Sequence, residues 1–249
     1  MRVTARELHQ PIRSLKERLV AHDLLAPDGG QLLDEVVAGL MTCIPKKVRA
    51  SNPWSYQTRA GTALTFRECS YNGYRYQVDI QFSIRGHGSD SAAPLTWQAV
   101  VIRVWSLDAN LCARDDWDSK RIVDVFRSGG AGKRRVMVRH HFDLANQGQE
   151  GPRYHVQIGG GADDDEYCWH PRQMALPRLL HLPVDLILAC ELVVANFFPD
   201  EYKTLRDEPE WEALVRRSED YFVRPSVTKW LGGIDRDDRP SLLHAAWNV

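Results

Sequence analysis

An uninterrupted period-two alternation of side chains constrains this 249-residue chain more than any other feature. From residue 74 to residue 84, apolar and aromatic side chains alternate with polar ones in the order YRYQVDIQFSI. Successive side chains of a strand point to opposite faces of a sheet, so this segment is predicted to be a long strand with one buried face. Residues 96–106 show the same period, but the tryptophans and valine on their second face predict a strand covered on both sides.

Helical spacing flanks this region on both sides. Residues 3–43 carry apolar side chains at helical intervals, and Pro11 is expected to open the first helix. His181-Leu182-Pro183 leads into a very apolar helix, and further helices are predicted as far as residue 247. Grouped strands and grouped helices predict an α+β fold with a mostly antiparallel sheet of about five strands. We expect one domain over residues 1–249, with a helical segment at 1–50, the sheet at 60–160 and a helical layer at 180–249.

Composition limits the classes of function. The formal net charge is -1, which provides no overall field that would attract nucleic acid or an anionic membrane. The five cysteines are odd in number and form no Cys-x-x-Cys pair, as expected of free thiols in a reducing compartment. Asp185 and Glu191 interrupt the most apolar stretch, and no apolar signal segment follows the N-terminus. We therefore expect a cytoplasmic protein without membrane association, and we assign it no cofactor and no metal ligand.

A predicted hairpin carries the most suggestive polar residues. Residues 133–144 and 153–158 are both predicted strands, and the short turn between them makes antiparallel pairing the expectation. The apolar pattern suggests a register in which paired residue numbers add up to 296. This register predicts three cross-strand pairs on the polar face: Arg139–Gln157, His141–His155 and Asp143–Arg153.

These residue types suit phosphodiester chemistry. Two imidazoles with ordinary pKa values near 6.5 can divide the roles of acid and base, so His141 and His155 are predicted to be catalytic. Asp143 is predicted to orient His141. Arginine binds phosphate and stabilises charge that develops on it, so substrate binding is assigned to Arg139, Arg153 and Gln157. The set is that of a metal-independent ribonuclease. It is equally the ordinary polar face of an exposed hairpin, where ion pairs contribute under about 1 kcal/mol.

The order R-x-H-x-D, a short turn, a strand with H-x-polar and a proline-led apolar helix resembles the TumE-type bacterial toxins and related bacterial proteins. The matching residues lie between 133 and 198, with Pro183 opening the helix. One position departs from the pattern, because Gln157 stands where a second histidine is expected. The resemblance implies a toxin-like or anti-phage defence role that acts on RNA.

Two other interpretations stay open. The acidic run at 163–166, followed by Cys168 and His170, has ligand types that hold metal ions, which would suit metal-dependent hydrolysis. No second ligand pair stands at a recognisable distance, so a solvated acidic loop is the preferred interpretation.

A non-catalytic subunit of a multiprotein complex is the alternative from a different class. Its exposed aromatic residues and terminal helices would recognise a protein partner.

Overall fold

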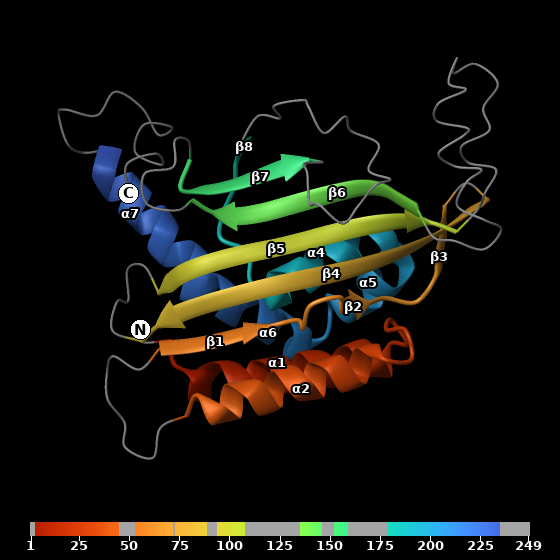
Figure 1. Cartoon of the computed structure of the whole chain (residues 1–249), viewed down its shortest axis with the longest axis horizontal. Coiled ribbons are helices and arrows are strands. Elements are labelled where there is room, and N and C mark those ends of the chain that lie inside the picture. The colour runs from red at the N-terminus through yellow and green to blue at the C-terminus, as the bar shows by residue number, and fades with distance from the viewer. Residues whose placement is uncertain are drawn as a thin grey trace.

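The computed structural model describes residues 3–44, 53–71, 73–88, 94–107, 135–145, 152–158 and 179–234. Its centre is one antiparallel sheet with the strand order β1-β4-β5-β6-β7-β8, in which β2 and β3 also pair with β4 (Figure 1). The strands are β1 (Pro53–Gln57), β2 (Leu64–Thr65), β3 (Cys69–Tyr71), β4 (Tyr74–His87), β5 (Leu95–Ser106), β6 (Arg135–Leu144), β7 (Tyr154–Ile158) and β8 (Leu179–Leu180).

The long strands β4 and β5 form the middle of the sheet. Their register places Ile80 opposite Ile102 and Phe82 opposite Val100. These side chains belong to one apolar face, on which Val78, Ile80, Phe82 and Ile84 of β4 are at most 3% exposed. The period-two pattern of the sequence arises here, because each buried residue is followed by one that points to the opposite, polar face.

The helices are α1 (Ala5–Ala21), α2 (Gly29–Thr42), α4 (Leu186–Phe197), α5 (Pro199–Leu205), α6 (Pro209–Ser218) and α7 (Arg224–Ile234), with a π-helical turn, η2 (Glu219–Val223), between α6 and α7. In Figure 1, α4 to α7 lie behind the sheet, and α1 and α2 flank its β1 edge. Helix α4 contacts β4 and β5, and α1 contacts α4 and α6. The apolar face of the sheet is therefore the face that the helices cover.

Local signals explain where the helices begin. Helix α1 starts after Thr4, whose backbone N–H donates to the Glu7 carboxylate at 2.7 Å. This capping arrangement overrides the expectation that Pro11 opens the helix, because Pro11 lies inside α1 instead. Helix α4 starts after Asp185, whose carboxylate accepts from the backbone N–H of Leu188 at 2.9 Å.

The predicted fold class is confirmed, since helices accompany a mainly antiparallel sheet. The strand count is higher than the predicted five, because β1, β2, β3 and β8 were not recognised. Three of these have two or three residues, which is too short for a periodic signal. The predicted helix at 240–247 lies outside the described residues.

Candidate functional site on the polar face of the sheet

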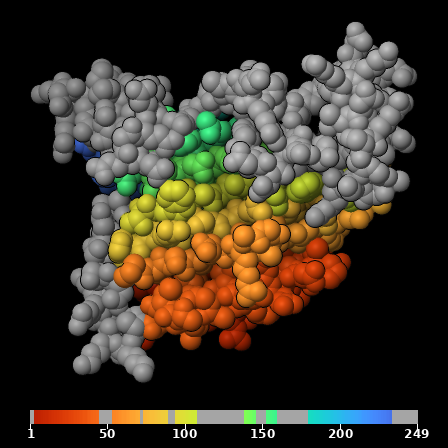
Figure 2. Space-filling view, viewed as in Figure 1, coloured from red at the N-terminus to blue at the C-terminus, as the bar shows by residue number. Residues whose placement is uncertain are grey.

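The face of the sheet turned away from the helices carries the polar residues that the sequence singles out. Side chains of β1, β4 and β5 reach the surface on this side of the molecule (Figure 2, orange to yellow). We call this surface the polar face. It includes Asp79 of β4, Trp97, Arg103 and Trp105 of β5, Arg139, His141 and Asp143 of β6, and His155 and Gln157 of β7.

Asp79 is the best-defined anchor of the polar face. It is only 2% exposed, and its carboxylate accepts from Arg103 Nε at 2.7 Å and from Arg103 Nη2 at 3.0 Å. Trp105 Nε1 donates to the same carboxylate at 2.8 Å, and the Arg103 guanidinium lies 5.0 Å from the centre of a Trp105 ring. A carboxylate in this setting is stable because both oxygens accept charge-assisted or indole hydrogen bonds.

The alternation over residues 74–84 predicts only that Asp79 lies on the polar face of its strand, and the cluster is not evident from that pattern. Each of the two long predicted strands has one charged residue near its centre, an acid in the first and a base in the second, but only the observed register shows that Asp79 lies directly opposite Arg103. An acid opposite a base at the centre of two long strands favours a buried ion pair over a solvated one.

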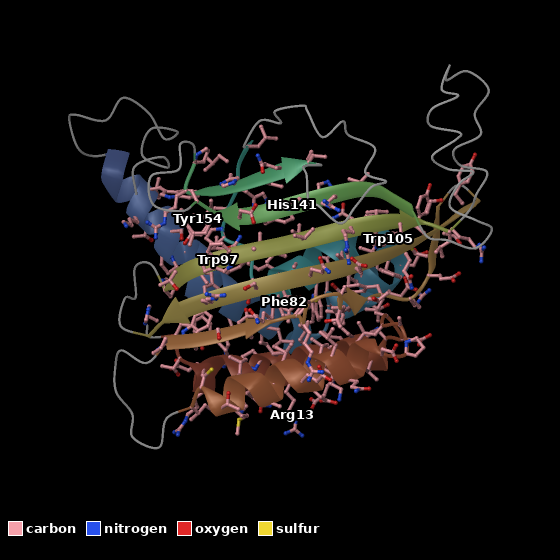
Figure 3. All side chains as sticks on the ribbon, viewed as in Figure 1. Arg13, Phe82, Trp97, Trp105, His141 and Tyr154 are labelled. Atoms are coloured by element: carbon pink, nitrogen blue, oxygen red, sulfur yellow. The ribbon has the colours of Figure 1, made fainter. Side chains whose placement is uncertain are left out.

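Arginine is repeated on the next strand. Arg139 of β6 lies directly opposite Arg103 of β5 and is 1% exposed. Cross-strand neighbours are about 5 Å apart at Cα, so two guanidinium-bearing side chains occupy adjacent positions. His141 follows two residues along β6 on the same face, opposite Val101 (Figure 3).

The environment of His141 changes its titration. The imidazole is half-buried, and burial, together with the smaller effects of the charges of Arg139, His140 and Arg103, lowers its pKa to about 4. The Nε2 atom is buried, and no group among the described residues forms a hydrogen bond with it. His141 is therefore a neutral imidazole at physiological pH, with one ring nitrogen left for a further interaction. His140, on the opposite face, also has a pKa lowered by burial.

The predicted register of the hairpin is wrong by two residues. The paired residue numbers add up to 298, so His141 lies opposite Gln157 and Asp143 lies opposite His155. Arg153 is aligned with Ala145, whose backbone N–H donates to the Arg153 carbonyl at 2.7 Å. The apolar pattern fixes only which face a residue points to, and a shift of two preserves the faces while changing every pair.

Five of the six predicted site residues share the polar face, although not as the predicted pairs, and Arg153 lies before the start of β7. His141 and His155 are diagonal neighbours rather than opposite residues. His155 is 2% exposed, and its Nδ1 donates to the Pro152 carbonyl at 3.1 Å. Diagonal neighbours are about 7–8 Å apart, so the two rings belong to one cluster without the direct opposition that the prediction required.

Other predicted features lie outside the described residues, including the acidic run at 163–166 with Cys168 and His170. Within the described ranges, no group of three or more histidine, cysteine, aspartate or glutamate residues is arranged to hold a metal ion. None of the described helices has the length and apolar character required to cross a membrane.

Comparison with other proteins adds no assignment to this geometry. Searches against protein-family models, curated proteins and solved structures found no match for the chain.

Proposed function

We propose that the polar face binds an RNA phosphodiester beside His141 and cleaves it without a metal ion, as a toxin-like or defence-associated ribonuclease. The observation that carries the proposal is the position of His141. A neutral imidazole with a buried, unbonded Nε2 lies next to two arginine side chains on neighbouring strands. A proton acceptor beside two guanidinium groups is the arrangement that attack on a phosphodiester needs.

The chemistry is a transesterification within the RNA strand. Nε2 of His141 accepts the proton of a ribose 2′-hydroxyl, and the 2′ oxygen attacks the adjacent phosphorus. The bond from phosphorus to the 5′ oxygen breaks, and that oxygen takes a proton delivered by water. The products are a 2′,3′-cyclic phosphate and a 5′-hydroxyl, with no oxidant, reductant or further reactant.

The remaining residues of the cluster support this step. Arg139, two residues from His141 on the same face, provides the positive charge that stabilises the growing negative charge on the phosphoryl oxygens, and Arg103, whose charge is paired with Asp79, contributes less. The Gln157 side chain, opposite His141, offers an amide donor to the same phosphate. Asp143, two residues from His141 on the same face, acts as a positioning residue.

His155 is assigned a positioning role in this proposal rather than the acid role. Its Nδ1 hydrogen is directed to the Pro152 carbonyl, so in the neutral ring Nε2 carries no proton to give. Its burial next to Asp143 suits a residue that holds β7 against β6.

The test is an RNA cleavage assay with a chelator present. Native protein, His141→Gln and the control His9→Gln are compared after circular dichroism has shown that all three are folded. His9 lies on α1, which flanks the β1 edge of the sheet, whereas β6 is three strands away from β1 in the strand order. Its Nδ1 is 2.7 Å from the Arg6 carbonyl oxygen. We expect His141→Gln to lower the rate at least about 100-fold and His9→Gln to leave it unchanged.

The products and a second substrate make the assay specific. Native protein should form 2′,3′-cyclic phosphate ends and should leave DNA of the same sequence intact, because DNA has no 2′-hydroxyl. Absence of cleavage by the native protein, or equal rates for native protein and His141→Gln, would overturn the proposal.

A second candidate function rests on a separate surface. Ile158 is 42% exposed, Leu179 is 49% exposed and Leu182 is 40% exposed. Ile158 and Leu179 lie on the same face of the neighbouring strands β7 and β8, and β8 is an outermost strand of the described sheet. Exposed apolar residues beside a sheet edge are typical of protein-binding surfaces, so a protein partner is the alternative.

This alternative is tested with Ile158→Lys and Leu179→Lys. A subunit role predicts that these variants lose a co-purifying protein that His141→Gln retains. Retention of that protein by the lysine variants, or its loss from His141→Gln, would count against this surface.

A further inference from the structure

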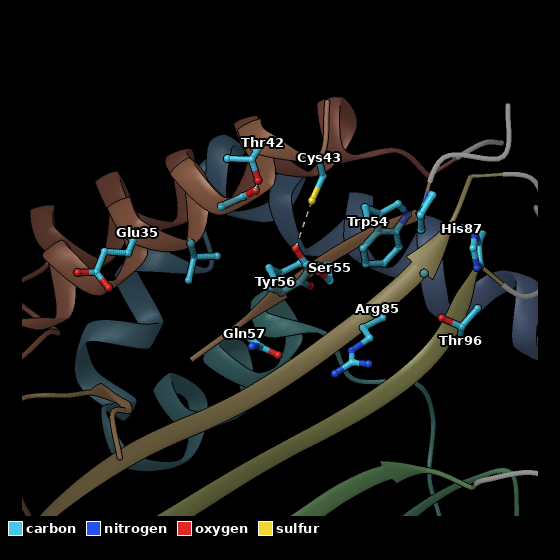
Figure 4. Close-up of a pocket in the computed structure, with 14 residues that line it drawn as sticks. Glu35, Thr42, Cys43, Trp54, Ser55, Tyr56, Gln57, Arg85, His87 and Thr96 are labelled. Atoms are coloured by element: carbon cyan, nitrogen blue, oxygen red, sulfur yellow. Dashed lines mark hydrogen bonds between the residues drawn. The ribbon is translucent and has the colours of Figure 1, made fainter. Parts of the chain in front are cut away.

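The described part of the chain has a groove beside the edge of the sheet, separate from His141. It has a volume of about 670 Å³ and runs between α2 and β1, reaching the ends of β4 and β5 (Figure 4). Its size is within the range of sites that hold a small organic group such as a nucleotide.

The polar side of the groove is rich in hydrogen-bond donors. Arg85 and His87 alternate along β4 and share one face, and Arg85 lies opposite Ser55 of β1. Thr96 of β5 also lines the groove. Across it, Glu35 of α2 is 3.5 Å from Arg59, so its charge is already opposed by a neighbouring arginine. The side of the groove formed by β4 and β5 therefore suits an anionic group such as a phosphate.

Trp97 joins the groove to the polar face. It lies directly opposite Arg85, whose guanidinium is 5.9 Å from the centre of a Trp97 ring. The Trp97 side chain is half-buried, so part of its ring is accessible. An aromatic ring combined with an arginine is the arrangement that binds a base of a single strand by stacking.

The distance between this position and His141 suits a continuous chain of nucleotides. His141 lies opposite Val101, four residues from Trp97 along β5. Four residues of a strand span about 13 Å, and an even spacing keeps Trp97 and His141 on the same face. Figure 3 shows both side chains along the sheet.

We infer that the substrate of the His141 site is single-stranded RNA, with a flanking base stacked on Trp97 and its phosphate bound by Arg85 at the mouth of the groove. The inference rests on the proposed function, because it extends the same face. Duplex RNA is excluded as the preferred substrate because its bases stack on one another and offer no free ring to Trp97.

Binding is measured first, by fluorescence anisotropy with labelled oligonucleotides carrying a 2′-O-methyl group throughout, which prevents cleavage. The protein variants are Trp97→Ala, Arg85→Gln and the charge-matched control Arg13→Gln, whose side chain is 63% exposed on α1. We expect Trp97→Ala and Arg85→Gln to raise the Kd for a single-stranded 12-mer about tenfold. Arg13→Gln should change it less than about twofold. A duplex of the same length should bind at least about tenfold more weakly than the single strand.

Cleavage then separates the two proposals. A dinucleotide offers the scissile linkage without a distant base, so Trp97→Ala should cut it as fast as native protein does while cutting the 12-mer more slowly. Cleavage of the 12-mer that depends on His141 but not on Trp97 or Arg85 would overturn this inference and leave the proposed function standing. Binding without any cleavage would overturn the proposed function, and equal affinity for duplex and single strand would overturn the inference.

Discussion

Asp79 shows how one carboxylate organises the polar face. It joins β4 to β5 through Arg103 and accepts from Trp105, all inside a nearly closed environment. Removing one member of a buried ion pair leaves the other charge without compensation, which is the expensive case in protein electrostatics. The ion pair therefore holds the arginine next to His141 in place.

The first prediction concerns this ion pair. Asp79→Asn should lower the free energy of unfolding by about 3 kcal/mol in urea denaturation, because the Arg103 side chain, which is only 13% exposed, loses its counter-charge. Asp34→Asn is the matched control, since Asp34 forms a 2.6 Å ion pair with Lys16 but is 61% exposed. The control should lose less than about 1 kcal/mol. Equal losses for the two variants would show that Arg103 does not depend on Asp79.

Two buried groups should make opposite contributions to the pH dependence of stability. Burial lowers the pKa of His141 to about 4, so its contribution is complete above pH 6.5 and is lost as the pH falls towards 4. Burial raises the pKa of Asp185 to about 6, against hydrogen bonds from Leu188 and Ser218 that lower it. Its contribution is present below about pH 4 and is lost as the pH rises through 6.

The second prediction follows from these opposite signs. Each pKa shift corresponds to about 3 kcal/mol of stability, so the opposite pH dependences that His141 and Asp185 contribute nearly cancel in the native protein between pH 4 and pH 6.5. His141→Gln should therefore lose stability as the pH rises through this window, and Asp185→Asn should gain it. Thermal unfolding measured at several pH values checks both slopes. Identical slopes for the two variants would contradict the burial of at least one group.

At the scale of the elements, the sequence pattern was most informative where periodicity is long. The strands β4 and β5 and the helix α4 were predicted close to their observed bounds, because the alternation of the strands and the apolar character of the helix extend over ten or more residues. Strand β1 was missed, although Trp54 and Tyr56 alternate with exposed residues, because five residues next to a basic segment provide too little signal.

The hairpin shows the limit of pattern reasoning for the site. Five of the six predicted residues share the polar face, but their partners were wrong, because the apolar pattern separates odd register shifts from even ones and does not separate one even shift from another. The Asp79 cluster was missed for a related reason. Its chemistry depends on which residues of β4 and β5 are opposite, and single-strand patterns do not contain that information.

The third prediction tests the register directly. The double variant Asp143→Cys with His155→Cys should form a disulfide on mild oxidation, because directly paired residues have the Cα separation that a disulfide needs. Asp143→Cys with Arg153→Cys is the matched control and should stay reduced. Preferential oxidation of the control pair would restore the register predicted from the sequence.

At the scale of the whole molecule, the helices cover the apolar face of the sheet, and the polar face is the one turned away from them. His22 of the segment after α1 is bonded to Glu208, the residue before α6, at 2.7 Å, and Arg18 reaches the same carboxylate at 3.4 Å. The segment at the end of α1 is thus joined to the start of α6, and α1 also contacts α4, which packs on β4 and β5. This arrangement supports the assignment of the polar face as the working surface.

The pH dependence of kcat/KM for RNA cleavage, measured in chelator from about pH 4 to about pH 8, is the most direct test of the role assigned to His141. We predict a rise with an apparent pKa of about 4 followed by a level rate through neutral pH, since a neutral His141 is the base. Circular dichroism at each pH restricts the comparison to folded protein. A bell-shaped profile centred near pH 6.5, or a profile that His141→Gln leaves unchanged, would contradict this account.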